Sequence, residues 1–391
     1  MSSIHPIYLD HGATAFPKAP GVTDAMVRFL AEASGNPGRG GHRLTVAASR
    51  AIEGAREEVA ALLGGDPERT LFGPGATFWI NTVLNSRLER GARIVVSALE
   101  HNAVMRPLRW LETHRGVQIA VVAGSGSHGV PTADEVAARV AEKKTALVVL
   151  THASNLTGAV LPVAEVVAAV APVPVVVDAA QTVGSLRIDF AALGAAALVC
   201  SGHKGLLGPP GIGVMLLAPG FEIEPLVRGG TGSHSESEVM PENLPDRLEA
   251  GTPNGVGAAG LGAACAWLRR HSVQAVQDHA RRLLGRLAPG LAETGKVTLY
   301  GWNGEAPHTG VLSFRVNGID SGDLAARLDR DHRVCVRAGL HCAPAAHRRL
   351  GTYPEGTIRV GVGPFNTEAD VDALVQAVRS AAASRILNFE L

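Results

Sequence analysis

The sequence predicts an α/β fold in which helices cover both faces of a mainly parallel sheet, followed by a smaller α+β domain. Short β-branched runs alternate with helix-like patterns from about residue 44 to 255, as is typical of a parallel sheet. Beyond Gly251-Thr-Pro-Asn254 the pattern changes to a long helical stretch and then to shorter elements. A chain of 391 residues is long enough for two domains, since domains usually have about 100–200 residues. We expect a large domain over 15–255 and a small domain over 256–391 together with 1–14.

Five apolar runs are predicted as strands of the large domain, because most are rich in β-branched residues and each ends in or just before a small or polar residue. In a parallel sheet the carboxyl ends of the strands meet at one edge, and ligands bind in the crevice outside it. We therefore expect the chemistry at this edge. The runs span residues 93–97, 118–122, 146–151, 173–178 and 197–201. Polar residues at or just after their ends are Glu100, His101, Asn155, Asp178, Gln181, Ser201, His203 and Lys204.

The small domain is expected to begin with an Ala-, Leu- and Arg-rich helical stretch over residues 256–294. No charge run or low-complexity linker separates the two domains in the sequence, so we expect a broad interface with the active cleft within it. Further strands are expected near 297–300, 310–316, 333–337 and 357–361, and helices near 321–330 and 367–384.

Charge and apolar content argue against several classes of protein. Lys and Arg together number 36, as do Asp and Glu, so no net field draws the chain to nucleic acid or to an anionic membrane. The first ten residues lack the pattern of a signal peptide, and charged residues and prolines interrupt the most apolar run, 163–180. Four irregularly spaced cysteines do not suggest a disulfide framework. We therefore expect a cytoplasmic protein with free thiols and no membrane span.

The segment from Ser201 to Val214 is the most informative part of the sequence. It places Lys204 among glycines after an apolar strand, which suits a Schiff-base lysine and also fits a lysine on a surface loop. Upstream, Asp178 and Gln181 follow another strand as Asp-x-x-Gln. A carboxylate at a strand end is well placed to keep a pyridinium nitrogen protonated, so that the ring accepts electrons. The two motifs in this order predict a site for pyridoxal 5'-phosphate (PLP).

With these motifs the sequence resembles the class V aminotransferase-like enzymes, and above all the cysteine desulfurases. The resemblance extends from Tyr8-Leu-Asp-His-Gly-Ala-Thr14 to Arg359-Val-Gly-Val-Gly-Pro-Phe-Asn366. It implies the fold type I of PLP-dependent transferases, the aspartate aminotransferase-like fold, with a mainly parallel seven-stranded sheet in the large domain. It also implies a cytoplasmic homodimer that uses PLP.

The resemblance further implies a role for each residue around the cofactor ring. Lys204 matches the lysine that binds the cofactor covalently, and Asp178 matches the partner of the ring nitrogen. Gln181 resembles the residue that hydrogen-bonds the phenolic oxygen. His101, in Glu-His-Asn-Ala, resembles the histidine that stacks on the ring; taken alone, it would more often be a capping or core histidine.

A second set of residues is implied for the cofactor phosphate. Gly75-Ala76-Thr77 precedes an expected helix and resembles the phosphate loop of the family, where N–H groups at a helix start favour an anion. Ser201 and His203 are expected to add contacts. Thr252 resembles the threonine that reaches the phosphate in the neighbouring subunit, which implies that the dimer completes the site.

Release of sulfur requires a soft nucleophile that is a thiolate near neutral pH. Cys342 lies close to Arg337 and His341, whose charges are expected to lower the pKa of its thiol. A buried structural cysteine is the alternative for this residue alone. The pattern Arg-x-Gly-x-His-Cys-Ala resembles the second group of cysteine desulfurases, which includes selenocysteine lyases, and implies that Cys342 accepts the sulfur.

Substrate-binding residues follow from the same resemblance. Arg359, in Thr-Ile-Arg-Val-Gly, matches the arginine that binds the substrate carboxylate, in keeping with the planar fork of its guanidinium. Asn155 resembles an asparagine near the phenolic oxygen and the substrate. Three roles are open for Arg337: binding the substrate carboxylate, stabilising the Cys342 thiolate, or only holding the loop. His11 departs from the usual Asp-Asn-Ala-Ala-Thr and places an imidazole near the substrate.

Other residues invite alternatives that the sequence leaves open or disfavours. Phe78 and Trp79 follow the phosphate loop and either pack in the core or narrow the entrance. Cys335 is one of several metal-type ligands, with His341, Cys342 and His347, but their spacing matches no zinc pattern, so no metal site is expected. Cys200 and Cys265 are expected to be small buried residues.

The sequence therefore predicts a PLP-dependent cysteine desulfurase that converts L-cysteine to L-alanine and carries the sulfur as a persulfide on Cys342. A thiol or a sulfur-acceptor protein would then take the sulfur. A selenocysteine lyase or another PLP-dependent C–S lyase is the alternative, which His11 keeps open. A simple aminotransferase has no use for Cys342, and a non-enzymatic scaffold has no need of Lys204, Asp178, His101 and Arg359.

Overall fold

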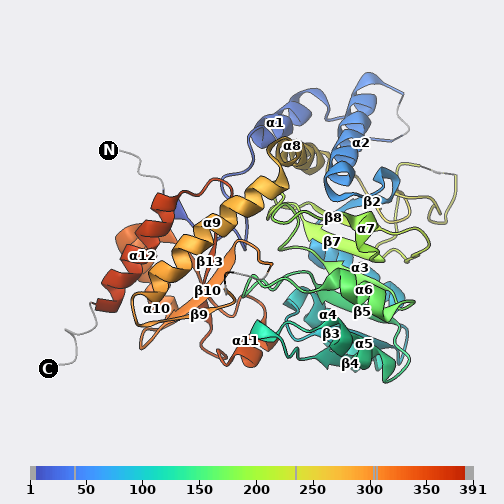
Figure 1. Ribbon diagram of the computed structural model, residues 1–391. Helices are drawn as coiled ribbons and strands as arrows, with labels where there is room; N and C mark the ends of the chain where they lie inside the picture. The colour runs from blue at the N-terminus through green and yellow to red at the C-terminus, as the bar shows by residue number, and fades with distance from the viewer. Residues whose placement is uncertain (1–5, 39–40, 234–235, 303, 305–306, 384–391) are drawn as a thin grey trace.

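A seven-stranded sheet forms the larger part of the molecule in the computed structural model, which describes residues 6–38, 41–233, 236–302, 304 and 307–383 (Figure 1). Strand β8 runs antiparallel to both of its neighbours, β2 and β7, and the remaining pairs are parallel. The prediction of a mainly parallel seven-stranded sheet is confirmed. Its order is β2 (Thr70–Gly73), β8 (Gly213–Leu217), β7 (Ala197–Ser201), β6 (Val175–Asp178), β5 (Leu147–Thr151), β3 (Arg93–Ser97) and β4 (Gln118–Val122).

Helices cover both faces of this sheet, because its central strands are apolar on both sides. Successive side chains of a strand point to opposite faces. Val95 therefore packs with one group of helices, whereas Ile94 and Val96 pack with the other. The first group includes α1 (Val22–Glu32), α2 (Arg43–Leu63), α5 (Ala133–Ala141), α6 (Val163–Val170), α7 (Phe190–Leu193) and α8 (Gly255–His271). The second includes α3 (Ala76–Arg87) and α4 (Asn102–Arg115).

The smaller part is built on a four-stranded antiparallel sheet with a separate apolar core (Figure 1). Leu312, Phe314 and Ile358 from the sheet pack against three helices in this core. The strand order is β12 (Arg337–Gly339), β13 (Thr357–Gly361), β10 (Val311–Val316) and β9 (Val297–Tyr300). The helices are α9 (Val273–Ala292), α10 (Ser321–His332) and α12 (Glu368–Ala383). A short parallel pair joins β1 (Ile7–Tyr8) to β11 (Val334–Cys335), and α11 (Pro344–Leu350) follows β12.

Two elements of the small domain differ from the prediction. The stretch 256–294 is two helices, because Ser272 has a φ of 67° and ends α8. Helix α8 packs on α1 and α2, and its Gly260 and Gly262 permit this approach, since a Cβ would lie 2.8 Å from Met26 and 2.9 Å from Ala55. The expected strand 333–337 is also divided, into β11 and β12 of different sheets.

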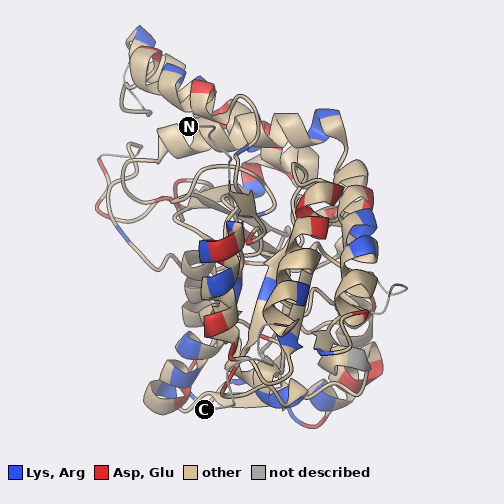
Figure 2. Cartoon of the chain, turned by 90° about the vertical axis from the view of Figure 1, so that its left-hand side faces the viewer, with Lys and Arg blue, Asp and Glu red and all other residues tan. Residues whose placement is uncertain are grey.

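The division into 15–255 and 256–391 remains a prediction, and residues 1–5 and 384–391 of the expected small domain lie outside the described residues. Figure 2 shows Lys and Arg beside Asp and Glu on the same helices, in keeping with their equal numbers. Within the described residues, no helix combines the length and the apolar character needed to cross a membrane.

Candidate active site

The carboxyl ends of β3, β5, β6 and β7 bring four predicted residues to one edge of the large sheet. His101 follows β3, Asn155 follows β5, Asp178 ends β6 and Lys204 follows β7. These strands are parallel neighbours, and Asp178 pairs in register with Thr151 of β5. The edge therefore gathers an imidazole, an amide, a carboxylate and an amine.

Asp178 and Lys204 form the electrostatic centre of this edge. Asp178 is 4% exposed, and its Oδ1 accepts a hydrogen bond of 3.0 Å from the backbone N–H of Ala180. Burial lowers the pKa of Lys204, and the nearby Asp178 carboxylate opposes that effect. Burial raises the pKa of Asp178, and Lys204 opposes it. A desolvated lysine has more of the neutral, nucleophilic amine that a Schiff base requires.

His101 caps the first turn of α4. Its Nδ1 lies 3.0 Å from the backbone N of Ala103 and accepts the hydrogen bond. Burial, and then the charges of Lys204 and Arg359, lower the pKa of His101 to about 4. The ring is therefore neutral at physiological pH. His101 shares a cavity of about 560 Å³ with Thr77 and Cys342, so an aromatic group bound there lies within reach of the imidazole face and the thiol.

The N-terminus of α3 forms an anion site beside β7. Its N-cap is Gly75, which has no side chain to satisfy the first N–H groups, and Ser201 Oγ accepts one bond of 3.3 Å from Ala76 N. A Cβ on Gly213 would lie 2.4 Å from Gly75 Cα, so glycine is required for this close approach. Free N–H groups at a helix start favour a phosphate. Thr77, in the first turn, lines the cavity with His101.

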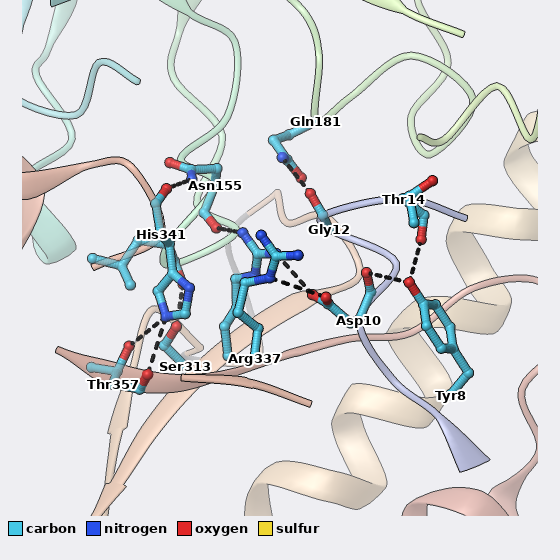
Figure 3. Close-up of polar contacts among 12 residues, drawn as sticks. Tyr8, Asp10, Gly12, Thr14, Asn155, Gln181, Ser313, Arg337, His341 and Thr357 are labelled. Atoms are coloured by element: carbon cyan, nitrogen blue, oxygen red, sulfur yellow. Dashed lines mark hydrogen bonds and ion pairs between the residues drawn. The ribbon is translucent and has the colours of Figure 1, made fainter. Parts of the chain in front are cut away.

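Gln181 and Asn155 connect this edge to the rest of the cleft (Figure 3). Gln181 Nε2 donates to Gly12 O at 3.0 Å, and Asn155 Nδ2 donates to His341 O at 2.6 Å. Asn155 Oδ1 is buried and has no partner among the described residues. A buried acceptor without a partner indicates a place for a bound group. Together with the lysine, the carboxylate and the anion site, it fits the predicted cofactor.

Cys342 lies on the turn between β12 and α11, and its thiol is exposed. His341 and Cys342 have φ values of 48° and 57°, which are unfavourable for residues other than glycine. Such strain persists only where the surroundings hold it. Here Asn102 N donates to Cys342 O at 2.8 Å, and Asn155 binds His341 O. Two bonds from the large sheet therefore fix the turn.

His341 does not act on the thiol as the sequence suggested. Burial lowers the pKa of His341 to about 2, and its Nε2 lies 3.1 Å from Thr357 O. The imidazole is thus neutral at any physiological pH. The prediction of a charged His341 beside the thiol is therefore wrong, and the residue instead anchors the turn to β13.

Arg359 and Arg337 share one carboxylate, that of Asp10, and Figure 3 shows Arg337 beside Asp10. Arg359 is 2% exposed; its NH2 lies 3.0 Å from Asp10 Oδ1, and its NH1 donates to Asn155 O at 3.2 Å. Arg337 Nε lies 3.1 Å from Asp10 Oδ2. No role was expected for Asp10 from the sequence. Two arginines predicted at one site without a counter-ion were the available signal.

Three other predicted residues lie around the cleft. His11 is half-buried, its Nδ1 has no partner among the described residues, and burial lowers its pKa to about 4. It lines a small cavity of about 40 Å³ with Lys204 and Gln181. His203 Nδ1 lies 3.0 Å from Thr14 Oγ1. Thr252 is exposed and lines neither this cavity nor the larger one beside His101.

The remaining candidates are structural. Trp79 is fully buried, and Phe78 is half-buried against the same core, which favours packing as their role. Cys200 and Cys265 are buried as predicted. Cys335 is half-buried with its Sγ 3.7 Å from Asp329 Oδ1, and no group of metal-type ligands is found in the described part of the chain.

Comparison with known proteins places this site in a family. The aminotransferase class-V family model matches residues 7–374. A probable cysteine desulfurase of Methanothermobacter thermautotrophicus is 33% identical over 387 residues, which cover 96% of this chain and 94% of the relative. The apo structure of a cysteine desulfurase from Thermococcus onnurineus has a TM-score of 0.90 at 31% identity, over 97% of this chain and 95% of that one. An S-sulfonic acid form of an Escherichia coli cysteine desulfurase has a TM-score of 0.85 at 29% identity, with the same coverage. The predicted resemblance and fold are confirmed.

Proposed function

The chain belongs to the aminotransferase class-V family and is a PLP-dependent cysteine desulfurase, and we propose that it transfers the sulfur of L-cysteine to Cys342. The observation that carries this role is the exposed Cys342 thiol, which shares a cavity with His101 and Thr77. A thiol held over the cofactor side of the cleft is what sulfur abstraction requires. No observation favours a selenocysteine lyase or another C–S lyase.

The sheet edge supplies the residues that would hold PLP. Lys204 would bind it covalently, Asp178 would pair with the ring nitrogen, Gln181 and Asn155 would contact the phenolic oxygen, and His101 would stack on the ring. When bound, PLP accepts the electron pair that is left when the α-proton of the substrate is removed. The phosphate is assigned to the N-terminus of α3. Its contacts are Ala76, Thr77, Ser201 and His203.

Two residues then act on the substrate itself. Arg359 binds the α-carboxylate of cysteine, since its buried guanidinium keeps N–H groups beyond those bonded to Asp10 and Asn155. Lys204 takes the α-proton, because its lowered pKa leaves more of the amine neutral. Arg337 supports Arg359 through the shared Asp10 carboxylate, and His11 lines the side of the cleft behind Lys204.

Sulfur transfer follows as a displacement at the substrate sulfur. The Cys342 thiolate attacks that sulfur, an S–S bond forms, and the substrate C–S bond breaks. The electron pair of the broken bond stays on the substrate β-carbon, which takes up a proton, and Lys204 returns a proton to the α-carbon to give L-alanine. Cys342 is left as a persulfide, from which a thiol or an acceptor protein removes the outer sulfur.

Two further features of the enzyme are proposed. We infer a homodimer, in which Thr252 of one subunit contacts the phosphate in the other. Thr252 is exposed and lines neither cavity of its own subunit, which supports this role. We also infer a cytoplasmic location, because all four cysteines are free and a reducing compartment keeps them so.

The test is release of sulfide and L-alanine from L-cysteine in the presence of a reductant. Cys342→Ala should lower both rates by about 100-fold or more, since its nucleophile is lost, while the visible absorbance of the bound cofactor is retained. Cys335→Ala is the matched control, because this thiol faces Asp329 and lines neither cavity. Equal rates for Cys342→Ala and the parent would exclude sulfur transfer through Cys342.

A further inference from the structure

Arg337 and Arg359 are paired directly opposite each other on the antiparallel strands β12 and β13. Side chains at directly opposite positions lie on the same face, and like charges there destabilise the sheet. Asp10 removes this conflict, because its two carboxylate oxygens lie 3.1 Å from Arg337 Nε and 3.0 Å from Arg359 NH2. One carboxylate thus serves two guanidinium groups.

The main chain holds Asp10 in this position. Gly361 N donates to Leu9 O at 2.7 Å, and His11 N donates to Gly361 O at 3.2 Å, so the segment around Asp10 is bonded to the end of β13. Tyr8 Oη donates to Asp10 O at 3.3 Å (Figure 3). These bonds fix the backbone of Asp10 beside β13, and the two ion pairs then hold its carboxylate between the arginines.

The charges of this cluster match a substrate with one carboxylate. Two guanidinium groups and one carboxylate leave a single positive charge, which one α-carboxylate neutralises. A second substrate carboxylate would meet the Asp10 carboxylate, whose side chain is 14% exposed, and like charges brought together there are disfavoured. Asp10 occupies the place beside Arg337 that a second carboxylate would take.

We propose that Asp10 is a specificity-determining residue, which reserves the arginine pair for amino acids with one carboxylate and excludes acidic amino acids. The inference rests on the proposed role of Arg359 in binding the substrate carboxylate. It adds the claim that the site excludes a class of ligand, the acidic amino acids, of which L-aspartate is one.

A series of charge variants tests the inference on the holoenzyme. The probes are L-alanine and L-aspartate, which differ by one carboxylate, and the dissociation constants come from the change in cofactor absorbance. Thermal stabilisation by each amino acid gives a second readout that needs no turnover. The cluster of Asp10, Arg337 and Arg359 carries one positive charge in the parent, two in Asp10→Asn and none in Arg337→Gln. The double variant, which combines these two substitutions, again carries one. Asp24→Asn, exposed on α1, is the matched control.

The ratio of the L-aspartate to the L-alanine dissociation constant should fall by about tenfold or more in Asp10→Asn, the size of one charge-assisted interaction. It should return to within about threefold of the parent in the double variant, whose charge is restored. Arg337→Gln should weaken L-alanine binding by about tenfold. This variant tests the charge argument even if Asp10→Asn does not fold, because the Arg337 side chain is half-exposed.

Two results would overturn the inference: an unchanged ratio in Asp10→Asn, or a double variant that keeps the altered ratio. If Asp10→Asn is unstable, unchanged L-alanine binding in Arg337→Gln would also overturn the inference. Arg359→Gln separates this inference from the proposed function. If that variant binds L-alanine as the parent does, the role of Arg359 itself is wrong; if its binding is lost while the Asp10 ratio is unchanged, only the role of Asp10 falls.

Discussion

The two sides of the cleft are held in place in different ways. On the side of the large sheet, Asp178, Lys204 and His101 follow parallel strands whose residues are almost all buried. On the opposite side, Cys342 lies on a turn with two residues in the left-handed region, fixed by single hydrogen bonds from Asn102 and Asn155. One side takes its geometry from the core of the domain, and the other takes it from a few contacts across the interface.

This difference assigns separate tasks to the two sides. Residues at the end of a buried strand keep their positions as long as the core is folded. A turn held by a few bonds depends on each of them, and a small displacement there affects a reaction that requires close approach. Changes at the sheet edge should therefore affect cofactor binding and all later steps, whereas changes at the turn should affect sulfur transfer alone.

The largest effect is expected at the sheet edge, from Lys204→Ala. The variant removes both the covalent attachment of the cofactor and the base for the α-proton, so L-alanine formation should fall by about 10²–10⁴-fold, the usual value of a positioned proton-transfer group. The visible absorbance of the lysine-bound cofactor should disappear with it. Lys144→Ala, an exposed lysine before β5, should match the parent in both measurements. Normal turnover by the Lys204→Ala protein would show that this edge does not bind the cofactor.

A smaller effect that spares the cofactor is expected at the turn, from His341→Val. Valine loses the contact with Thr357 and is a β-branched residue at a φ of 48°, which costs about 1–3 kcal/mol of strain. We expect sulfide release to fall by about 10–100-fold, the same free energy expressed as a rate, with the cofactor absorbance unchanged.

His341→Asn is the matched control for the turn, because asparagine tolerates the left-handed region. It should retain most of the sulfide release. If His341→Val loses cofactor absorbance as well, the two sides do not have separate tasks, and the turn is part of the cofactor site.

The sheet edge was predictable from the sequence because its residues follow directly from local pattern. Short apolar runs gave β3, β5, β6 and β7, and the rule that ligands bind at the carboxyl ends of parallel strands placed Asp178 and Lys204 together. The same logic gave Cys200 as a buried residue of β7. Each inference needed only nearby residues and the geometry of a parallel sheet.

The turn side was less predictable, because it depends on contacts between segments far apart in the chain. Asp10 meets Arg359 across 349 positions, and Asn155 meets His341 across 186. The neutral state of His341 follows from burial, which no local pattern reveals. The break at Ser272 was missed for a related reason: α8 and α9 have continuous helical composition but pack in different cores.

The smallest effect is expected on stability and not on turnover, and it concerns Glu100 beside His101, whose burial it tests. Its side chain is fully buried, and it accepts hydrogen bonds from Thr151 N at 2.9 and 3.0 Å and from Ser97 Oγ. Burial raises its pKa from 4.5 to about 8, and Asp178 adds to the effect. At pH 7 the carboxyl is therefore protonated in the folded protein and ionised in the unfolded chain.

The sign of the pH effect follows from this proton. A folded pKa above the unfolded one means that the folded state binds the extra proton between pH 4.5 and about 8. The stabilisation is complete below pH 4.5 and is lost as the pH rises to about 8. Glu100→Gln has no proton to lose. The difference in unfolding free energy, parent minus variant, should therefore decrease with pH by up to about 1.4 kcal/mol per unit. Urea unfolding of the holoenzyme from pH 5 to 8 measures it, with exposed Glu89→Gln as the control. Parallel curves for parent and Glu100→Gln would mean that Glu100 stays ionised, so that the hydrogen bonds from Ser97 and Thr151 outweigh burial at the sheet edge.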